Sequence, residues 1–308
     1  MNLLFYSAGE NGSAWLKALS RSLPEAQIRT WAGAPVIDID YAVLWKPPGE
    51  LLESLAHTKA VFNLGAGVDG IAHLAALKPG IPLIRLEDAG MIEQMIEYAC
   101  HAVLRRYREF DVYAEQQRAG LWRPRRRISK AGFGVGILGL GVLGAAVAAA
   151  LARFGFPLYG WSRSCKAIAG VECGAGLAEL DAVLARARVL ICLLPLTAET
   201  RGMLDRRMLS RLPHDAYLVN LARGDILVEE DLLTLLDGGH LAGAMLDVFH
   251  DEPLPAEHAF WHHPKIVVTP HVSAATLIDE SVEQIVAKIR RLEAGLPVTG
   301  IVERARGY

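Results

Sequence analysis

The sequence has no large excess of charge of either sign, and its first residues do not resemble a leader. Its 34 acidic and 32 basic side chains leave a formal net charge of −2. This balance argues against a protein that binds nucleic acid or a membrane surface non-specifically. The first ten residues lack a basic stretch followed by a long apolar core, so no signal peptide is expected.

Cysteine is also scarce. The four cysteines lie far apart, without a C-x-x-C spacing or a neighbouring histidine cluster, at Cys100, Cys165, Cys173 and Cys192. We therefore expect reduced thiols in a cytoplasmic protein rather than a disulfide framework or a zinc site. The adjacent His262 and His263 would point to opposite faces of an extended segment, so no metal site is expected there either.

Apolar residues, by contrast, are abundant. They make up 52% of the 308 residues, and the mean hydropathy is +0.25. Such values are typical of a mostly parallel sheet whose two faces are both covered by helices. The length suits two domains or one large domain.

The longest run without a charged residue, residues 131–152, has two interpretations. Its 22 residues could span a bilayer as a helix. However, six glycines fall in its first part, where they disfavour a helix, and an alanine-rich, helix-forming part follows. We favour a strand, a turn and a helix, in which Gly139, Gly141 and Gly144 form a G-x-G-x-x-G turn. Such a turn lets a pyrophosphate sit on a helix N-terminus.

The rest of the chain alternates between apolar strands and helical segments, which predicts parallel α/β architecture. Strands are expected at 2–6, 41–45, 60–63, 82–86, 133–138, 157–161, 189–194, 217–221, 243–248 and 266–269. Helices are expected at 15–23, 91–119, 177–187, 205–211, 229–236 and 276–294, and between the glycine turn and residue 154. The sequence thus predicts two doubly wound parallel-sheet domains, Rossmann-like or flavodoxin-like, with a cleft between them.

Two further segments leave alternatives open. The glycine-rich loop 63–70 follows an expected strand, where open α/β sheets bind ligands, but an ordinary turn would have the same composition. The basic run 123–130 could mark a nucleic-acid patch. No aromatic platform accompanies it, so a solvated connection into the next domain is favoured.

The end of the expected strand 157–161 indicates which dinucleotide binds. An NAD-binding fold places a carboxylate about 20 residues after the glycines. Here Ser162 stands 18 residues after Gly144, and Arg163 follows it. Arginine binds phosphate through a planar fork, and Ser162, Ser164 and Lys166 add donors. We therefore expect NADP rather than NAD, although these could be ordinary surface residues.

Three more strand ends carry chemistry suited to hydride transfer to a 2-keto acid. Arg223 can bind a carboxylate and polarise the neighbouring carbonyl. His271 can protonate the developing alkoxide as a general acid. Glu252, if it lies beside His271, favours the imidazolium. Each residue alone could be structural, but carboxyl ends of parallel strands converge at one edge of the sheet.

These motifs resemble one family along the whole chain. G-I-L-G-L-G-V-L-G, N-L-A-R-G-D-I-L-V-E-E-D-L, D-V-F-x-x-E-P-L-P and T-P-H-V-S-A occur in that order. In this they resemble the D-isomer-specific 2-hydroxyacid dehydrogenases. Within that family the chain is most similar to the glyoxylate/hydroxypyruvate reductase A branch, through W-K-P-P at 45–48 and N-L-G-A-G-V-D at 63–69 among other segments.

The resemblance implies Arg223, Glu252 and His271 as the catalytic set. It implies a substrate site that includes Trp45, the backbone amides of Ala66 and Gly67, and Arg223. Cofactor contacts are expected at Gly139, Gly141, Val142, Leu143, Gly144, Trp161, Ser162, Arg163, Ser164, Lys166, Leu194, Pro195, Leu196, Thr200, Leu221, Ala222, Asp247 and Ser273.

The resemblance also implies how the chain is organised. A discontinuous substrate domain would comprise residues 1–98 and 275–308, and a dinucleotide-binding domain residues 99–274. A homodimer is expected, with much of its interface supplied by the helix from Met91 and the segment through Trp122. The expected function is reduction of small 2-keto acids, glyoxylate to glycolate and hydroxypyruvate to D-glycerate, with NADPH preferred over NADH. The alternatives are a dehydrogenase for lactate-like or bulkier 2-keto acids and a non-catalytic NAD(P)-sensing regulator.

Overall fold

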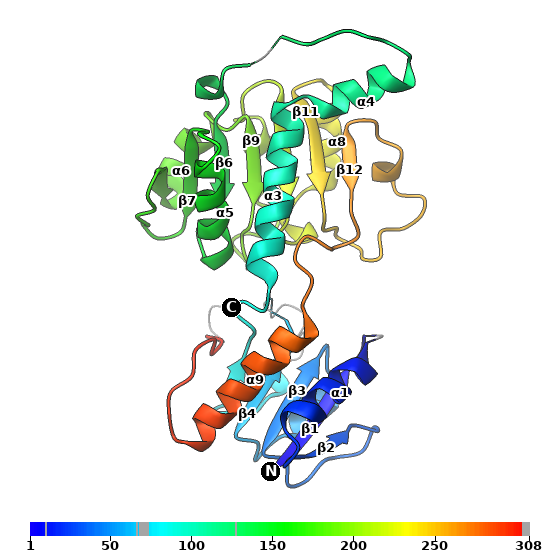
Figure 1. The fold of residues 1–308 in the computed structure, drawn as a ribbon, viewed down its shortest axis with the longest axis vertical. Coiled ribbons are helices and arrows are strands. Elements are labelled where there is room, and N and C mark those ends of the chain that lie inside the picture. Colours follow the sequence, from blue (N-terminus) through cyan, green and yellow to red (C-terminus); the bar gives the residue numbers. More distant parts are fainter. Residues whose placement is uncertain (10, 66, 68–73, 127, 304–308) are drawn as a thin grey trace. The chain divides into compact units, whose positions relative to one another are not determined.

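The chain forms two compact units. The computed structural model describes residues 1–9, 11–65, 67, 74–126 and 128–303 (Figure 1). The first unit comprises Met1–Met91 and Thr276–Tyr308, and the second comprises Ile92–Ala275. The expected division at 98/99 falls inside helix α3 (Met91–Tyr107), which continues unbroken there. Met95 and Ala99 of this helix are buried in the core of the second unit, so the division comes earlier in the chain.

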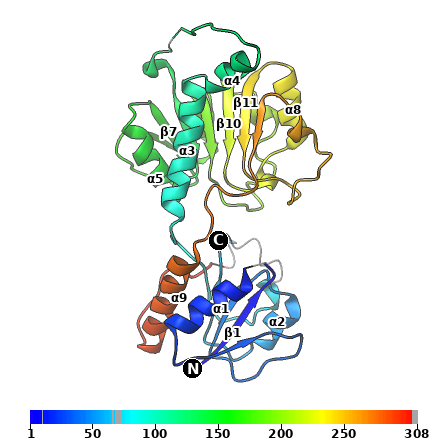
Figure 2. The ribbon, with the colours of Figure 1, turned by 45° about the vertical axis from the view of Figure 1, so that its right-hand side comes forward.

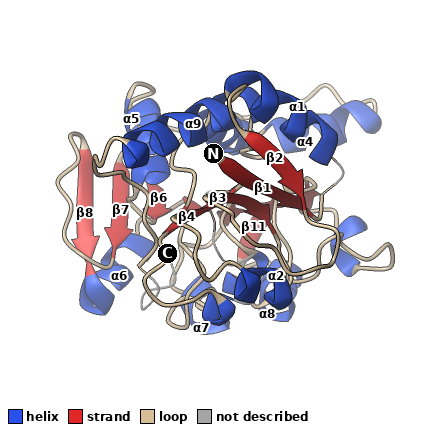
Figure 3. Cartoon of the chain, turned by 90° about the horizontal axis from the view of Figure 1, so that it is seen from below, coloured by secondary structure: helices blue, strands red, loops and turns tan. Residues whose placement is uncertain are grey.

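The first unit is built on a parallel five-stranded sheet in the order β2-β1-β3-β4-β5. Its strands are β1 (Asn2–Ser7), β2 (Gln27–Thr30), β3 (Tyr41–Trp45), β4 (Ala60–Asn63) and β5 (Leu83–Ile84). Its helices are α1 (Gly12–Ser22), α2 (Gly49–Ser54), the short 3₁₀ helix η1 (Leu74–Ala76) and α9 (Ile278–Glu293). Figure 3 shows α1 and α9 on one face of this sheet and α2 on the other.

Helix α9 returns from the end of the chain to complete the first unit. It buries Val282, Ile285 and Ile289. Its last residue, Glu293, accepts hydrogen bonds from the Tyr41 hydroxyl at 2.6 Å and from Lys59 Nζ at 2.8 Å. Both partners belong to the N-terminal part of the chain, so the first unit is complete only when both chain segments are present.

The second unit contains a parallel seven-stranded sheet in the order β12-β11-β10-β9-β6-β7-β8. Its strands are β6 (Val135–Leu138), β7 (Leu158–Ser162), β8 (Val171–Ala175), β9 (Val189–Cys192), β10 (Ala216–Asn220), β11 (Leu241–Leu246) and β12 (Ile266–Val268). Its other elements are α4 (Phe110–Arg118), η2 (Lys130–Gly132), α5 (Val142–Ala152), α6 (Gly176–Leu184), α7 (Arg206–Leu209), η3 (Gly224–Ile226), α8 (Glu229–Asp237) and η4 (Ala259–Trp261).

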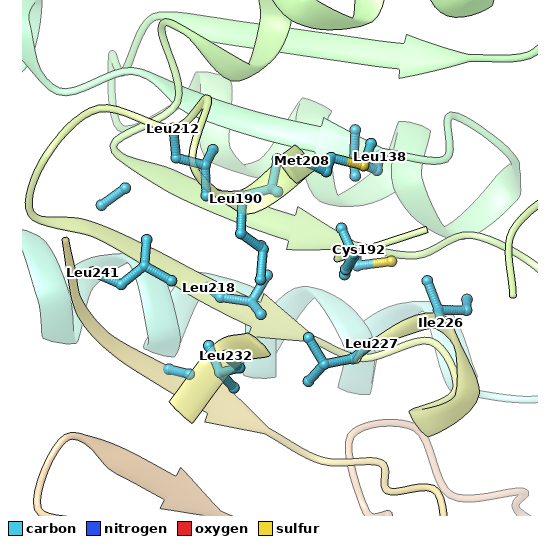
Figure 4. Packing of buried hydrophobic residues seen from close by; sticks show 14 of the residues in the cluster. Leu138, Leu190, Cys192, Met208, Leu212, Leu218, Ile226, Leu227, Leu232 and Leu241 are labelled. Atoms are coloured by element: carbon cyan, nitrogen blue, oxygen red, sulfur yellow. The ribbon is translucent and has the colours of Figure 1, made fainter. Parts of the chain in front are cut away.

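Alternating residues of the central strands form two separate cores, one on each face of this sheet. Val189 and Ile191 of β9 pack in the cluster that includes α3 and α5. Leu190 and Cys192 of the same strand pack in the cluster that includes α6, α7 and α8 (Figure 4). Figures 1 and 2 both show α3 lying across the sheet. The fold class predicted from the sequence, doubly wound parallel sheets in both parts of the chain, is confirmed.

Some elements differ from the prediction. The helix expected over 91–119 is two helices, α3 and α4, because Glu109 adopts a left-handed backbone with φ of 56°. The apolar face ends there too, since α3 buries residues in the core whereas α4 buries none. Strands β2 and β8 were not predicted.

The uncharged run 131–152 does not form one helix. It contains the end of η2, then β6, the glycine turn and the 11-residue α5. Within the described ranges, no helix combines the length and the apolar character needed to cross a membrane. The interpretation as strand, turn and helix is therefore confirmed.

Candidate active site

The parallel strands of the second unit bring their carboxyl ends to one edge of the sheet. The strand order reverses between β6 and β9, because the chain runs outward from β6 to β7 and β8 and then returns to β9 on the other side. The two strands are joined at their ends by the N–H of Leu193, which donates to the carbonyl of Leu138 at 2.8 Å. Open α/β sheets bind ligands at such a switch point.

The glycine turn lies at this switch point, and each glycine has its own reason. Gly139 has a φ of +97°, and a Cβ there would lie 2.6 Å from the carbonyl oxygen of Leu193. A Cβ on Gly144 would lie 1.8 Å from the carbonyl oxygen of Gly139. At Gly141 nothing lies within 4 Å of a Cβ position, and no side chain caps α5. The open approach at Gly141 and the uncapped helix N-terminus fit a pyrophosphate.

The end of β7 provides basic groups and no carboxylate. Arg163, Ser164 and Lys166 are exposed after this strand. Ser162 is buried, and its hydroxyl donates to the carbonyl of Ser164 at 2.6 Å, which fixes the turn. Trp161 is also buried, and its indole N–H donates to the carbonyl of Gly176 at 2.7 Å. The exposed cations could bind a ribose phosphate. The buried Trp161 stabilises the end of β7 through its hydrogen bond to Gly176.

The turn after β9 is closed by Thr200. Its hydroxyl donates to the carbonyl of Pro195 at 2.6 Å and accepts the N–H of Thr197 at 2.8 Å. Leu194 is buried and Pro195 is exposed, whereas Leu196 and Thr200 are half-buried. Val142 at the start of α5 is 60% exposed.

The loop that carries Arg223 is held by a buried amide that sequence reasoning did not single out. Asn220, the last residue of β10, is fully buried. Its Nδ2 donates to the carbonyl of Arg223 at 3.2 Å, and its Oδ1 accepts the N–H of Ala222 at 3.2 Å. The signal was present, since a buried polar side chain at the end of an apolar strand must find partners. Leu221 and Ala222 are buried beside it.

His271 and Glu252 form the pair predicted from the sequence. His271 Nδ1 lies 2.8 Å from Glu252 Oε2, and the N–H of Phe249 donates to Glu252 Oε1 at 3.0 Å. Burial raises the pKa of Glu252, but the hydrogen bonds from His271 and Phe249 and the positive charges on His271 and Arg223 more than offset it. The pKa of Glu252 therefore lies below its ordinary 4.5. An ionised carboxylate only accepts, so Nδ1 carries the proton of this bond and Nε2 is the nitrogen that can serve a substrate.

The loops that carry Arg223 and Glu252 touch each other. A Cβ on Gly224 would lie 1.8 Å from the backbone of Phe249. Asp225 pairs with His250 at 2.7 Å, which joins the two loops again. Arg223, Glu252 and His271 are thereby brought to the same edge of the sheet as the glycine turn.

The loop that carries His271 is organised around the carboxylate of Asp247. Asp247 is fully buried. Its Oδ1 accepts the Thr269 hydroxyl at 2.6 Å and the N–H of Val272 at 2.9 Å, and its Oδ2 accepts the N–H of Ser273 at 2.8 Å. Asp247 and Ser273 were predicted to contact the cofactor, and the structure shows that their mutual bond supports the His271 loop.

The substrate residues predicted in the first unit lie after β3 and β4. Trp45 ends β3, and its ring lies against Gly65, where a Cβ would be only 2.6 Å away. Asn63 Nδ2 donates to the carbonyls of Gly65 at 2.9 Å and Gly67 at 2.8 Å. Ala66 lies outside the described residues. Trp45 and Gly67 therefore share the carboxyl edge of the first sheet.

The described histidine, cysteine and acidic side chains form neither a metal centre nor a disulfide. In the part of the chain that the structure describes, no group of three or more His, Cys, Asp or Glu side chains is arranged to hold a metal ion. The four cysteines are free thiols. His263 Nε2 lies 3.3 Å from Asp237, while His262 is exposed.

Comparison with known proteins adds a family and several solved structures. The family model of the NAD binding domain of D-isomer specific 2-hydroxyacid dehydrogenases matches residues 100–273. A D-isomer specific 2-hydroxyacid dehydrogenase of Xanthobacter autotrophicus, solved with NADPH and MES, is 40% identical with a TM-score of 0.93. The NADPH-dependent glyoxylate/hydroxypyruvate reductase of Sinorhizobium meliloti, solved with NADP and sulfate, is 35% identical with a TM-score of 0.93.

A third similar structure is a probable 2-hydroxyacid dehydrogenase of Rhizobium etli, solved with NADP, HEPES and L(+)-tartaric acid, at 31% identity and a TM-score of 0.93. Each of the three alignments covers 100% of this chain and 99% of the other. The similarity therefore extends over both units.

Proposed function

The chain belongs to the D-isomer specific 2-hydroxyacid dehydrogenases, and we propose that it is an NADPH-preferring reductase of small 2-keto acids. Its reactions would be glyoxylate to glycolate and hydroxypyruvate to D-glycerate. The observation that carries the proposal is the His271–Glu252 pair at 2.8 Å, at the same sheet edge as Arg223 and the glycine turn. The glyoxylate/hydroxypyruvate reductase of Sinorhizobium meliloti, 35% identical over the whole chain, supports the substrate class.

The cofactor is proposed from the residues at the switch point. NADPH, when bound, supplies the hydride. The N-terminus of α5 and the backbone at Gly141 hold its pyrophosphate, and Arg163 with Lys166 binds the ribose phosphate. NADPH or NADP is bound in all three similar structures described above.

Each of the three catalytic residues has a different role in the reduction of the keto acid. Arg223 binds the substrate carboxylate and draws electron density from the neighbouring carbonyl. His271 Nε2 delivers a proton to the carbonyl oxygen as the hydride reaches the carbon, so the alkoxide never has to exist free. Glu252 fixes the tautomer and orientation of the ring through its bond to Nδ1. Trp45, Ala66 and Gly67 are proposed as further substrate contacts.

The test is a steady-state panel of 2-keto acids measured with NADPH and with NADH. We expect NADPH oxidation with glyoxylate and hydroxypyruvate at a higher kcat/KM than with pyruvate or longer 2-keto acids. A preference for pyruvate or bulky acids would favour the lactate-like alternative instead. Tight NADPH binding without turnover of any substrate would contradict an enzyme and favour a nucleotide-sensing regulator.

The Arg163→Ala variant tests the choice of cofactor. We expect the KM for NADPH to rise about tenfold to a hundredfold, because a charged hydrogen-bonding partner of the 2′-phosphate is lost. The KM for NADH should stay within about twofold, since that cofactor has no such phosphate. Arg153→Ala is the matched control, because Arg153 is exposed at the other end of α5. An equal rise in KM for both cofactors would show that Arg163 does not bind the 2′-phosphate.

A homodimer through the second unit is part of the proposal. Helix α4 buries none of its residues, and Trp122 in the segment that follows is 97% exposed. Exposed apolar side chains of this kind favour burial against a partner. Light scattering should give twice the mass of the chain, and Trp122→Ser should shift the protein toward the monomer.

A further inference from the structure

We infer that Tyr98 of α3 is a positioning residue for His271, acting through the hydroxyl of Thr269 and the buried carboxylate of Asp247. The inference rests on the proposed role of His271 as the general acid. Tyr98 itself belongs to neither the catalytic set nor the cofactor site described above. Its effect on catalysis is exerted only through the segment 269–275, which follows β12 and carries His271.

The backbone of His271 needs support from its surroundings. Its φ is 55°, in the left-handed region that non-glycine residues rarely occupy. Such a conformation persists only where neighbouring groups hold it in place. Here the N–H of His271 donates to the backbone carbonyls of Asp247 at 2.9 Å and Thr269 at 3.1 Å. The direction of the imidazole therefore depends on how firmly Asp247 and Thr269 are fixed.

Asp247 holds both sides of His271 at once. Its carboxylate accepts the Thr269 hydroxyl on one side and the N–H groups of Val272 and Ser273 on the other. The side chain is fully buried, where a carboxylate is stable only if donors surround it. Losing one of the three donors therefore loosens the whole loop and not only a single bond.

The direction of each hydrogen bond follows from what the groups can donate and accept. A hydroxyl has one hydrogen to donate, and that of Thr269 goes to Asp247. The Tyr98 hydroxyl lies 2.5 Å from Thr269 Oγ1, so Tyr98 must be the donor there. Burial, aided by the charge of Asp247 and opposed by the contact with Thr269, raises the pKa of Tyr98 to about 12. Tyr98 is therefore protonated and able to donate throughout the neutral range.

Helix α3 supplies a rigid base for this contact. Met95 and Ala99 on the same helix are buried against the sheet. Gln94 lies one turn before Tyr98, on the same side of the helix. Its amide donates to the carbonyl of Ala275 at 3.0 Å and accepts the N–H of Ala275 at 3.1 Å. One side of α3 thus holds the segment 269–275 at both ends, with His271 between them.

The experiment compares Tyr98→Phe, Thr269→Val, Thr269→Ser and the double variant Tyr98→Phe/Thr269→Val. Tyr98→Phe and Thr269→Val should each lower kcat about tenfold, because a misdirected acid transfers its proton less well. The KM for the keto acid and the Kd for NADPH should change less than about twofold, since binding groups are untouched. Thr269→Ser retains the hydroxyl and should restore kcat to within about threefold of the wild type.

The double variant tests whether both residues act along one path. If Tyr98 works through Thr269, adding Tyr98→Phe to Thr269→Val should lower kcat no further. Tyr217→Phe is the matched control. The Tyr217 hydroxyl is buried with no hydrogen-bond partner among the described residues, so its removal should leave kcat unchanged. Additive losses in the double variant would overturn the inference.

A second readout does not depend on turnover. The proton between His271 Nδ1 and Glu252 should give a downfield proton NMR signal, assigned by its loss in Glu252→Gln. It should weaken or shift in Tyr98→Phe and match the wild type in Tyr217→Phe. An inactive wild type would refute the proposed function, and this signal would then decide the inference alone. If the wild type is active and Tyr98→Phe matches it both in kcat and in this NMR signal, the inference is refuted and the proposed function stands.

If Tyr98→Phe fails to fold, comparing Thr269→Val with Thr269→Ser still tests the inference. Equal kcat in those two variants would contradict the inference, because they differ in the hydroxyl that accepts from Tyr98. A rise in KM with an unchanged kcat would also contradict it, since Tyr98 would then act on binding.

Discussion

The His271→Asn variant is expected to lose turnover by a factor of about 10² to 10⁴, the usual contribution of a positioned general acid. The loss should fall on kcat, because the proton is needed only as the carbonyl oxygen becomes an alkoxide. NADPH should bind with an unchanged Kd, since the glycine turn and Arg163 are intact. Stopped-flow single-turnover kinetics and a fluorescence titration measure the two quantities separately.

His262→Asn is the control for this variant. His262 is an exposed histidine of the same unit, and its loss should leave kcat at the wild-type value. The role assigned to His271 would be wrong if His271→Asn retained more than about a tenth of wild-type kcat with an unchanged circular dichroism spectrum.

Arg223→Lys is expected to lower kcat/KM by a factor of about 10² to 10³. Lysine keeps the positive charge but loses the planar fork that binds a carboxylate through two parallel hydrogen bonds. The loss should appear in both kcat and KM, because the same guanidinium binds the substrate and polarises its carbonyl. The measurement is a set of initial rates over a range of glyoxylate concentrations at saturating NADPH.

Two further variants serve as comparisons for Arg223→Lys. Arg211→Lys changes a surface arginine that pairs with Asp181, and it should leave kcat/KM unchanged. Arg223→Ala should lose more than Arg223→Lys, since it removes the charge as well. If Arg223→Lys had full activity, the substrate carboxylate would have to bind elsewhere.

The central strands were predictable because their residues are apolar almost without interruption. β9 reads Val-Leu-Ile-Cys and is buried throughout, as a strand covered on both faces must be. The two strands that were missed lie at the edges of their sheets. β2 reads Gln-Ile-Arg-Thr and β8 reads Val-Glu-Cys-Gly-Ala, and an edge strand with one open side can carry such polar residues.

The principal residues of the candidate site were predictable from the sequence, but the residues that hold them in position were not. Arg223, Glu252 and His271 could be placed together because each follows an expected parallel strand. The supporting roles of Tyr98 and Asp247 could not be predicted, because they lie in hydrogen bonds between distant parts of the chain. Tyr98 and Thr269 are 171 residues apart, a pairing that no local pattern encodes.

The discontinuous first unit has a consequence for synthesis on the ribosome. The first 91 residues emerge well before α9, whose side chains pack in the same unit and bind Tyr41 and Lys59. At about 5 to 20 residues per second, the whole second unit is translated in the interval, which takes roughly ten to forty seconds. The second unit is continuous in sequence. It can therefore fold on the nascent chain before α9, which the first unit needs, has been synthesised.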